Sequence, residues 1–155
     1  MINTSLCYIE KDGKYLMLHR IKKKNDLNLD KWIGIGGKFE EKESPEDCVI
    51  REALEETGLR LIRPLYRGII TFVSDQYETE WMHLFTATEF DGDIKECDEG
   101  VLEWVDKETL YSLPMWEGDK IFLDLIAKPS PFFSLKLSYQ GDKLLSAYLN
   151  GEKIR

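Results

Sequence analysis

The chain has 155 residues, the length of one domain with a single hydrophobic core, so we expect one domain over residues 1–155. Hydrophobic residues make up 43% and charged residues 32%, a globular composition that excludes a disordered chain. No apolar stretch approaches the ~18 residues that span a membrane, and the N-terminus lacks a signal pattern. We therefore expect a soluble, cytoplasmic protein without a membrane partner.

The net charge of −8 argues against a nucleic-acid polymer as partner, because proteins that grip a phosphate backbone usually present a basic face. An acidic protein that binds a polyphosphate needs divalent cations between its carboxylates and the phosphate oxygens. The cysteines are odd in number and irregularly spaced, at Cys7, Cys48 and Cys97. This pattern predicts neither a disulfide framework nor a zinc site. We interpret the three cysteines as reduced thiols that serve as small apolar residues.

The N-terminal part of the chain predicts strands over residues 4–10, 14–20 and 32–35. Asp12-Gly13 is a typical turn for the first hairpin, and the polar residues 21–31 predict a loop. A helix over residues 45–57 follows. Ser44 can cap this helix, with Pro45 in the first position, Asp47 completing a capping box and Gly58 ending it.

The second half predicts further strands over residues 65–73, 80–88, 102–105, 132–139 and 143–148. Turns are expected at Asp91-Gly92 and Gly141-Asp142. Helices are expected over residues 107–112 and 116–127. Hairpins mixed with separated helices predict an α+β fold, a sheet flanked by helices.

The helix over residues 45–57 has two distinct faces. At 100° per residue its apolar arc, expected to face the sheet, consists of Val49, Ile50, Ala53 and Leu54. Glu52, Glu55 and Glu56 form a separate, outward-facing arc near the C-terminus, where their mutual repulsion and the helix dipole both destabilise them. A bound hard cation reverses the sign of that interaction. The alternative is a solvated charged face with an Arg51–Glu55 ion pair.

Residues around this helix fit the pattern G-x5-E-x7-R-E-U-x-E-E-x-G-U, where U is a bulky apolar residue. The matching residues are Gly37, Glu43, Arg51, Glu52, Glu55, Glu56, Gly58 and, at the final U, Leu59. This segment resembles the Nudix box. Ala53 stands at the first U and is smaller than the strict pattern asks for, but it lies on the apolar arc.

The resemblance implies a Nudix-type α/β/α sandwich with a mixed central sheet and a catalytic loop–helix–loop. It implies that Glu52, Glu55 and Glu56 hold Mg²⁺, with Mn²⁺ as a possible substitute, and that the Gly36 carbonyl is a further ligand. Glu43 and Arg51 would be structural, with Arg51 bracing the loop and orienting the carboxylates. Gly37 and Gly58 complete the structural motif.

Family members often supply one more carboxylate from a later loop, and Glu99 is the candidate here, as an extra ligand or general base. The alternative is a solvated turn residue. The reaction implied is hydrolysis of X-P-P-X, because a divalent ion lowers the pKa of water and neutralises charge on phosphate oxygens. A nucleoside triphosphate would give a monophosphate and pyrophosphate.

The whole chain resembles the MutT group of enzymes that sanitise oxidised nucleotides, so 8-oxo-dGTP is the expected substrate. Residues 113–119 resemble the purine-recognising segment of a mammalian member, which implies that Trp116 stacks on the base and Asp119 hydrogen-bonds it. Gly118 and Ile33 replace polar residues of that member, so recognition cannot be identical. The alternative for Trp116 is a core or cap residue of the following helix.

Arg20, Gly37 and Lys38 are further candidates for substrate binding, whereas the lysine run 22–24 is more typical of a solvated loop. His19 and His83 look like ordinary strand residues.

The expected partner is a small nucleotide, and the protein is expected to be a monomer or homodimer. Two other functions stay open: hydrolysis of another substrate (ADP-ribose, a dinucleoside polyphosphate or an ordinary dNTP), and a non-catalytic nucleotide sensor.

Overall fold

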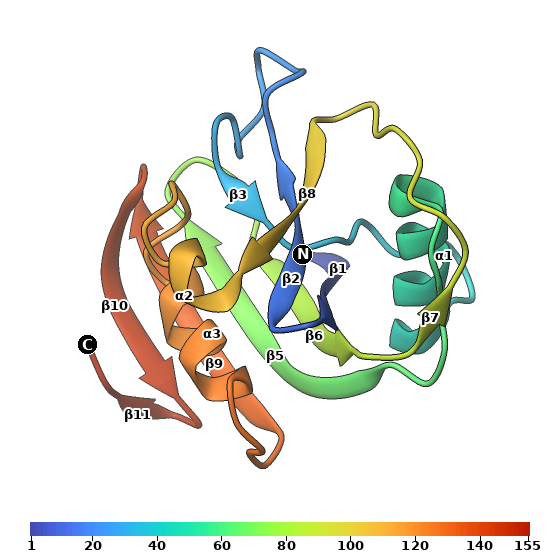
Figure 1. Ribbon diagram of the computed structural model, residues 1–155. Helices are drawn as coiled ribbons and strands as arrows, with labels where there is room; N and C mark the ends of the chain where they lie inside the picture. Colours follow the sequence, from blue (N-terminus) through green and yellow to red (C-terminus); the bar gives the residue numbers. More distant parts are fainter.

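The computed structural model describes residues 1–155 and consists of one large mixed sheet with helices on both faces (Figure 1). The strands are β1 (Ile2–Lys11), β2 (Lys14–His19), β3 (Trp32–Ile33), β4 (Arg60–Leu61), β5 (Leu65–Ser74), β6 (Glu80–Ala87), β7 (Phe90–Asp91), β8 (Val101–Asp106), β9 (Phe133–Gln140), β10 (Lys143–Leu149) and β11 (Glu152–Lys153). The helices are α1 (Pro45–Thr57), α2 (Lys107–Leu110) and α3 (Asp119–Ile126).

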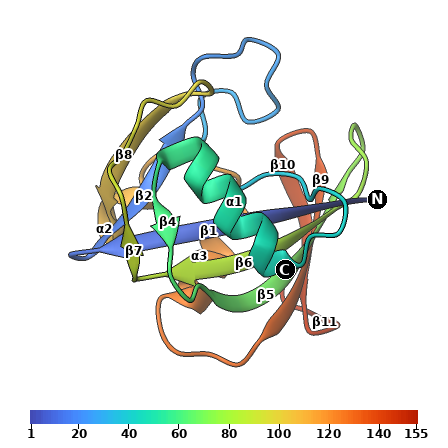
Figure 2. The same cartoon turned by 90° about the vertical axis from the view of Figure 1, so that its right-hand side faces the viewer.

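The strand order of the main sheet is β11-β10-β9-β5-β6-β1-β2-β3, and β8 pairs with β2. β1 with β6 and β5 with β9 are parallel pairs, while the other neighbours are antiparallel. Two hydrophobic clusters lie on opposite faces, one packing α1 and the other packing α3. Figure 2 shows α1 in front of the sheet and α3 behind it. The α+β sandwich expected from the sequence is confirmed.

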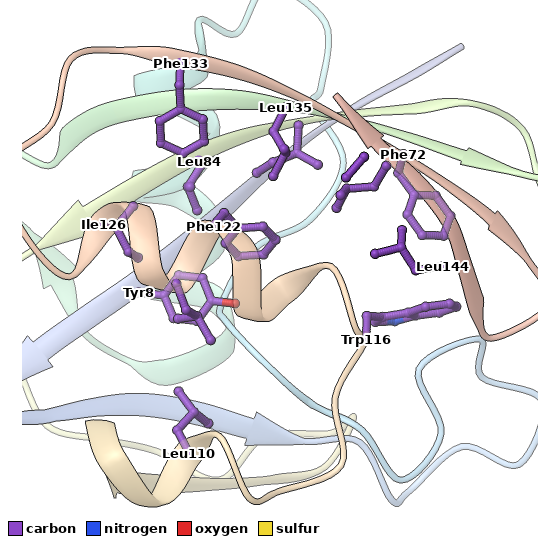
Figure 3. Packing of buried hydrophobic residues seen from close by; sticks show 14 of the residues in the cluster. Tyr8, Phe72, Leu84, Leu110, Trp116, Phe122, Ile126, Phe133, Leu135 and Leu144 are labelled. Atoms are coloured by element: carbon purple, nitrogen blue, oxygen red, sulfur yellow. The ribbon is translucent and has the colours of Figure 1, made fainter. Parts of the chain in front are cut away.

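Successive side chains of β1 point to opposite faces of the sheet, so this strand contributes to both clusters. Tyr8 packs in the cluster with α3, whereas Cys7 and Ile9 pack in the cluster with α1. The cluster that packs α3, shown from close by in Figure 3, extends from Ile126 to Trp116 at its edge.

The three cysteines are free and buried, as the sequence predicted. No helix is both long and apolar enough to cross a membrane.

Helix α1 has the predicted bounds and caps. The Ser44 side chain accepts from the Asp47 N–H, the Asp47 carboxylate accepts from the Ser44 N–H, and Gly58 ends the helix at a φ of 82°. One expectation is wrong, because Leu54 is 46% exposed. The buried arc is centred on Val49 and Ala53, so Leu54 falls beyond its edge.

Strand β3 and the segment that follows it lie between β1 and β2, which separate after their hairpin. Its residues pair with both strands: Ile33 lies opposite Leu18 of β2, and Ile35 forms a bridge with Cys7 of β1. This explains why β3 ends two residues earlier than the predicted strand over residues 32–35. A Cβ on Gly36 would lie 1.8 Å from the Ser5 carbonyl oxygen, so only glycine permits this close approach.

The helix predicted over residues 116–127 begins only at Asp119. Gly118 is the N-cap residue, and its N–H donates to the Tyr139 hydroxyl at 2.7 Å. Trp116 thus precedes the helix and turns into the core. The two-residue strands β4, β7 and β11 were not predicted, because periodicity needs longer segments to show.

Candidate active site

Six acidic residues line one cavity of about 260 Å³ at the C-terminal end of α1: Glu52, Glu55, Glu56, Glu96, Asp98 and Glu99. Glu52, Glu55 and Glu56 come from α1, and Glu99 comes from the loop before β8. The backbone brings this loop to the helix, since the Lys95 N–H donates to the Thr57 carbonyl at 2.9 Å. The structure therefore brings together the four acids that the sequence singled out.

The acids of α1 do not all face outward, contrary to expectation. The Glu55 side chain is 58% exposed, but that of Glu52 is only 15% exposed. Burial, together with the negative charges of Glu99 and Glu52, raises the pKa of Glu56 to about 8. Burial also raises the pKa of Glu52, although the Arg51 guanidinium opposes the shift. Ionised carboxylates this close together store repulsion that a cation would relieve.

Arg51 connects the helix to the preceding loop. Its guanidinium donates to both Glu43 oxygens, at 2.7 and 2.9 Å, and to the Lys38 carbonyl at 3.0 Å. One of its nitrogens also donates to Glu52 at 2.8 Å and to Glu55 at 3.1 Å. The hydrogen bonds from Arg51 hold the pKa of Glu43 below its usual range. Arg51 thus fixes two carboxylates of the cavity and the loop beside them.

Two glycines let the loop after β3 lie against the acids. The Gly36 N–H donates to a Glu56 oxygen at 3.2 Å. A Cβ on Gly37 would lie 2.4 Å from the Glu52 carboxyl carbon, so a larger residue would displace that carboxylate. Glycine at position 37 therefore leaves the room in which the Glu52 carboxylate lies.

The residues around the cavity fit a hard divalent cation by their chemistry. The four predicted acids, Glu52, Glu55, Glu56 and Glu99, offer carboxylate oxygens, the donors that Mg²⁺ prefers. Their mutual repulsion favours a cation between them. No three His, Cys, Asp or Glu side chains yet converge on one point. Glu52 and Glu55 are instead held by Arg51, and Glu99 by Arg20 at 2.9 Å, so binding requires these side chains to reorient.

A second cavity of about 260 Å³ lies on the α3 side of the sheet. Trp116, 6% exposed, forms part of its wall and of the core, with edge-on contacts to Phe72 and Tyr139. Its indole N–H donates to the Asn28 side-chain oxygen at 2.7 Å, and the Lys31 ammonium lies 4.5 Å from the ring centroid. Trp116 is thus both a core residue and a pocket residue.

Asp119, the first residue of α3, lines the same cavity. It is 7% exposed, and its carboxyl group forms no hydrogen bond within the protein. Burial raises its pKa to about 8, although the Lys31 charge opposes the shift. A buried carboxyl group without a protein partner is suited to a ligand that brings its own polar atoms.

The two cavities share a wall. Gly36 lines the second cavity, which we call the base pocket, while its N–H holds Glu56 of the acidic cavity. Arg20 also lines the base pocket and donates to Glu99 of the acidic cavity. A planar group in the base pocket can thus be joined to a chain of phosphates in the acidic cavity.

A line of hydrogen bonds connects the far ends of the two cavities through the loop after β2. Asn28, which accepts from Trp116, has its own N–H bonded to the Asp26 carboxylate at 3.0 Å. Asp26 accepts from Arg20 at 2.6 Å, and Arg20 reaches Glu99. Lys23 lines the acidic cavity and lies 3.6 Å from Glu99. The loop is therefore part of the site.

The base pocket is lined by all five predicted substrate-binding residues: Arg20, Gly37, Lys38, Trp116 and Asp119. Ile33 also lines it. Sequence reasoning missed other lining residues, namely Thr4, Asn28, Phe72, Glu80 and Met82. Glu80 carried a signal, because it shares a strand face with the apolar Met82 and Leu84, where a charged residue is unusual.

The histidines stand apart from both cavities. His83 is bonded to Tyr66 and to the Asn3 side chain, and burial lowers its pKa. His19 stacks on Trp32 and bonds Asp30. Neither lines the acidic cavity or the base pocket.

Comparisons with known proteins agree with this arrangement. The NUDIX domain model matches residues 2–126. The Nudix hydrolase YvcI of Bacillus subtilis is 34% identical over 96% of this chain and 94% of its own. The oxidized purine nucleoside triphosphate hydrolase of Danio rerio is 32% identical over 79% of each chain.

A solved structure agrees as well. The MutT protein of Bacillus halodurans superposes with a TM-score of 0.85 at 30% identity, covering 98% of this chain and 99% of that one. The family model covers the helix with its acids, both cavities' central residues and the sheet between them. The chain therefore belongs to the Nudix hydrolase family, whose members act on pyrophosphate bonds, and it resembles the MutT-like members over nearly its whole length.

Proposed function

We propose that this chain is a Mg²⁺-dependent nucleoside triphosphate pyrophosphohydrolase that acts in the cytoplasm on oxidised purine nucleotides such as 8-oxo-dGTP. The observation that carries the proposal is the shared wall between an acidic cavity and a pocket with an indole and a buried carboxyl group. The Danio rerio relative, named an oxidized purine nucleoside triphosphate hydrolase, supports the same substrate class.

Glu52, Glu55, Glu56 and Glu99 would hold the cation, together with the Gly36 carbonyl. When bound, the ion would supply Lewis acidity, neutralising charge on the phosphate oxygens and making water acidic enough to attack phosphorus near neutral pH. Arg51 would keep the loop beside the cavity in place through Glu43 and the Lys38 carbonyl when Glu52 and Glu55 turn toward the ion. Glu99 is the candidate for the group that accepts the proton of the attacking water.

The base pocket suits an oxidised purine for a chemical reason. Guanine presents O6 and N7 as acceptors, whereas its 8-oxo form carries a hydrogen on N7. Asp119, protonated near neutral pH, offers one O–H donor and one C=O acceptor, which match O6 and N7–H of the oxidised base. The ordinary base would place its N7 acceptor against the carboxyl acceptor, and Trp116 provides the stacking surface.

The first test is kcat/KM for 8-oxo-dGTP and dGTP side by side, with Mg²⁺ present and with it chelated. We expect a preference for the oxidised base of roughly tenfold to a hundredfold, since one repulsive pair replaces a hydrogen bond. Chelation should abolish turnover of both. Equal turnover of the two nucleotides would keep the Nudix chemistry and reject the oxidised-purine assignment.

Replacing Arg51 by Lys should lower kcat by roughly 10–100-fold, the usual effect of removing a group that orients metal ligands. Lysine keeps the charge but cannot reach Glu43 and the Lys38 carbonyl together with the helix acids. The Mg²⁺ concentration for half-maximal turnover should rise. Arg60→Lys, in an exposed ion pair with Asp91, is the matched control, and an equal response of both variants would contradict the role of Arg51.

A further inference from the structure

The base pocket contains a second carboxyl group that the proposed function does not use. Glu80 is the first residue of β6, lies opposite Phe72 of β5 and lines the pocket. One of its oxygens, Oε2, accepts the Thr4 hydroxyl hydrogen at 2.8 Å. The other, Oε1, has no hydrogen-bond partner in the protein and is not sealed from the cavity. Glu80 therefore presents a fixed acceptor to whatever fills this part of the pocket.

The place of Glu80 along the pocket follows from its neighbours. Thr4, which holds Glu80, forms a bridge with Lys38, the residue directly after the glycines that contact Glu52 and Glu56. This is the phosphate end of the pocket. Trp116 and Asp119 mark the base end.

In a nucleoside triphosphate the sugar lies between the base and the phosphates. Thr4 pairs with Lys38 at the phosphate end, and Glu80 lies opposite Phe72, whose ring contacts Trp116 at the base end. We infer that the Thr4–Glu80 pair lies between the two ends, at the level of the sugar. Burial raises the pKa of the Glu80 carboxyl group, although the hydrogen bond from Thr4 and the charge of Lys38 oppose the shift. An ionised carboxylate accepts hydrogen bonds and donates none. The sugar hydroxyls are the donors that a nucleotide offers at this level.

We propose that Thr4 and Glu80 form a sugar subsite in which the Glu80 carboxylate accepts hydrogen bonds from the ribose hydroxyls, so that this chain prefers ribonucleotides to 2′-deoxyribonucleotides. The inference rests on the proposed function, because it takes the base and phosphate ends from it. An acidic side chain on the ribose 2′-hydroxyl is a recurrent device in dinucleotide sites. A 2′-deoxy sugar leaves part of the acceptor capacity of Glu80 unused, which costs roughly tenfold to a hundredfold in affinity for a charged acceptor.

A purely structural role for Glu80 makes a different prediction. If the carboxylate only ties the start of β6 to β1 through Thr4, its replacement would weaken all nucleotides equally. The ratio between ribonucleotide and deoxyribonucleotide is therefore the informative quantity, since it cancels general losses of stability or packing.

The experiment measures the dissociation constants of the products 8-oxo-GMP and 8-oxo-dGMP by calorimetry, and kcat/KM for the two triphosphates. Wild type should favour the ribonucleotide about tenfold or more in both measurements. Glu80→Leu should bring the ratio close to one, and Glu80→Gln should give an intermediate value, because an amide oxygen is a weaker acceptor. Glu78→Gln, two residues earlier and exposed, is the matched control and should keep the wild-type ratio.

Thr4→Val gives a second route to the same answer if Glu80→Leu does not fold. It leaves the carboxylate in place but removes the hydroxyl that orients it, so the ratio should also fall. A wild-type ratio near one, or a ratio that survives Glu80→Leu or Thr4→Val, overturns the sugar subsite. If the wild-type protein hydrolyses neither triphosphate, the proposed function is rejected instead. The affinities for the two monophosphate products would then still decide the role of Glu80.

Discussion

Replacing Glu56 by Gln is expected to lower kcat by about a hundredfold or more, while the protein stays folded. A charged ligand contributes several kcal/mol of transition-state stabilisation at a metal site, and each 1.36 kcal/mol corresponds to roughly tenfold in rate. Glu56 is the most enclosed of the helix acids and has two acidic neighbours in the cavity, Glu52 and Glu99. Its replacement by an amide removes a carboxylate that a bound cation would keep ionised.

Folding should survive this substitution for a local reason. Gln has the same shape, and its amide oxygen can still accept the Gly36 N–H. The measurement combines steady-state turnover at saturating Mg²⁺ with a thermal melt. Glu46→Gln, on the exposed first turn of the same helix, is the control and should keep full activity. Normal Mg²⁺-dependent turnover of the Glu56→Gln variant would refute the assignment of the acidic cavity as the catalytic site.

Asp119→Asn is expected to remove a pH dependence of folding stability. The folded-state pKa of Asp119 is raised from 3.8 to about 8, so between these values the folded chain binds a proton that the unfolded chain has released. Stability therefore falls as pH rises from about 4 to about 8. Because one pKa unit corresponds to about 1.36 kcal/mol, the loss is on the order of a few kcal/mol. The Asn variant cannot titrate and should become the more stable protein as the pH increases.

The check is urea denaturation of wild type and variant across this pH window, which isolates Asp119 as a difference between two curves. Asp106→Asn, on an exposed residue, should run parallel to wild type. The same Asn variant should keep most of the preference for 8-oxo-dGTP, since its amide offers an N–H donor and a C=O acceptor in place of the O–H and C=O of the protonated acid. A stability difference that does not change with pH would mean that Asp119 is ionised in the folded protein.

The sequence predicted helix α1 more accurately than the base pocket. Helix α1 obeys local rules: Ser44 and Asp47 cap it, and Gly58 ends it, so its bounds follow from neighbours in the chain. The spacing of the three helix glutamates likewise places them together without any tertiary information. Glu99 could be proposed only from the family resemblance, and the structure brings it to the cavity through the Lys95–Thr57 backbone contact.

The base pocket depends on contacts between residues far apart in the sequence. Thr4 and Glu80 are 76 residues apart, and Trp116 and Asn28 are 88 residues apart, yet each pair forms a hydrogen bond. No local pattern predicts such pairs. The N-terminal end of α3 has a contact of the same kind, because the Gly118 N–H donates to the Tyr139 hydroxyl of a distant strand.

The sequence by itself determined the fold class, the helix with its caps, and the clustering of Glu52, Glu55 and Glu56, because these follow from short-range periodicity and from spacing within one helix. Only the tertiary structure decided which carboxylates are buried, that Gly36 joins the two cavities, and that Glu80 lines the base pocket. The physical reason is the insertion of residues 32–38 between β1 and β2, which parts the two strands and brings the loop with Gly36 against both cavities. The insertion depends on backbone pairing with two strands that are distant in the sequence, and the residues of one segment do not predict such pairing.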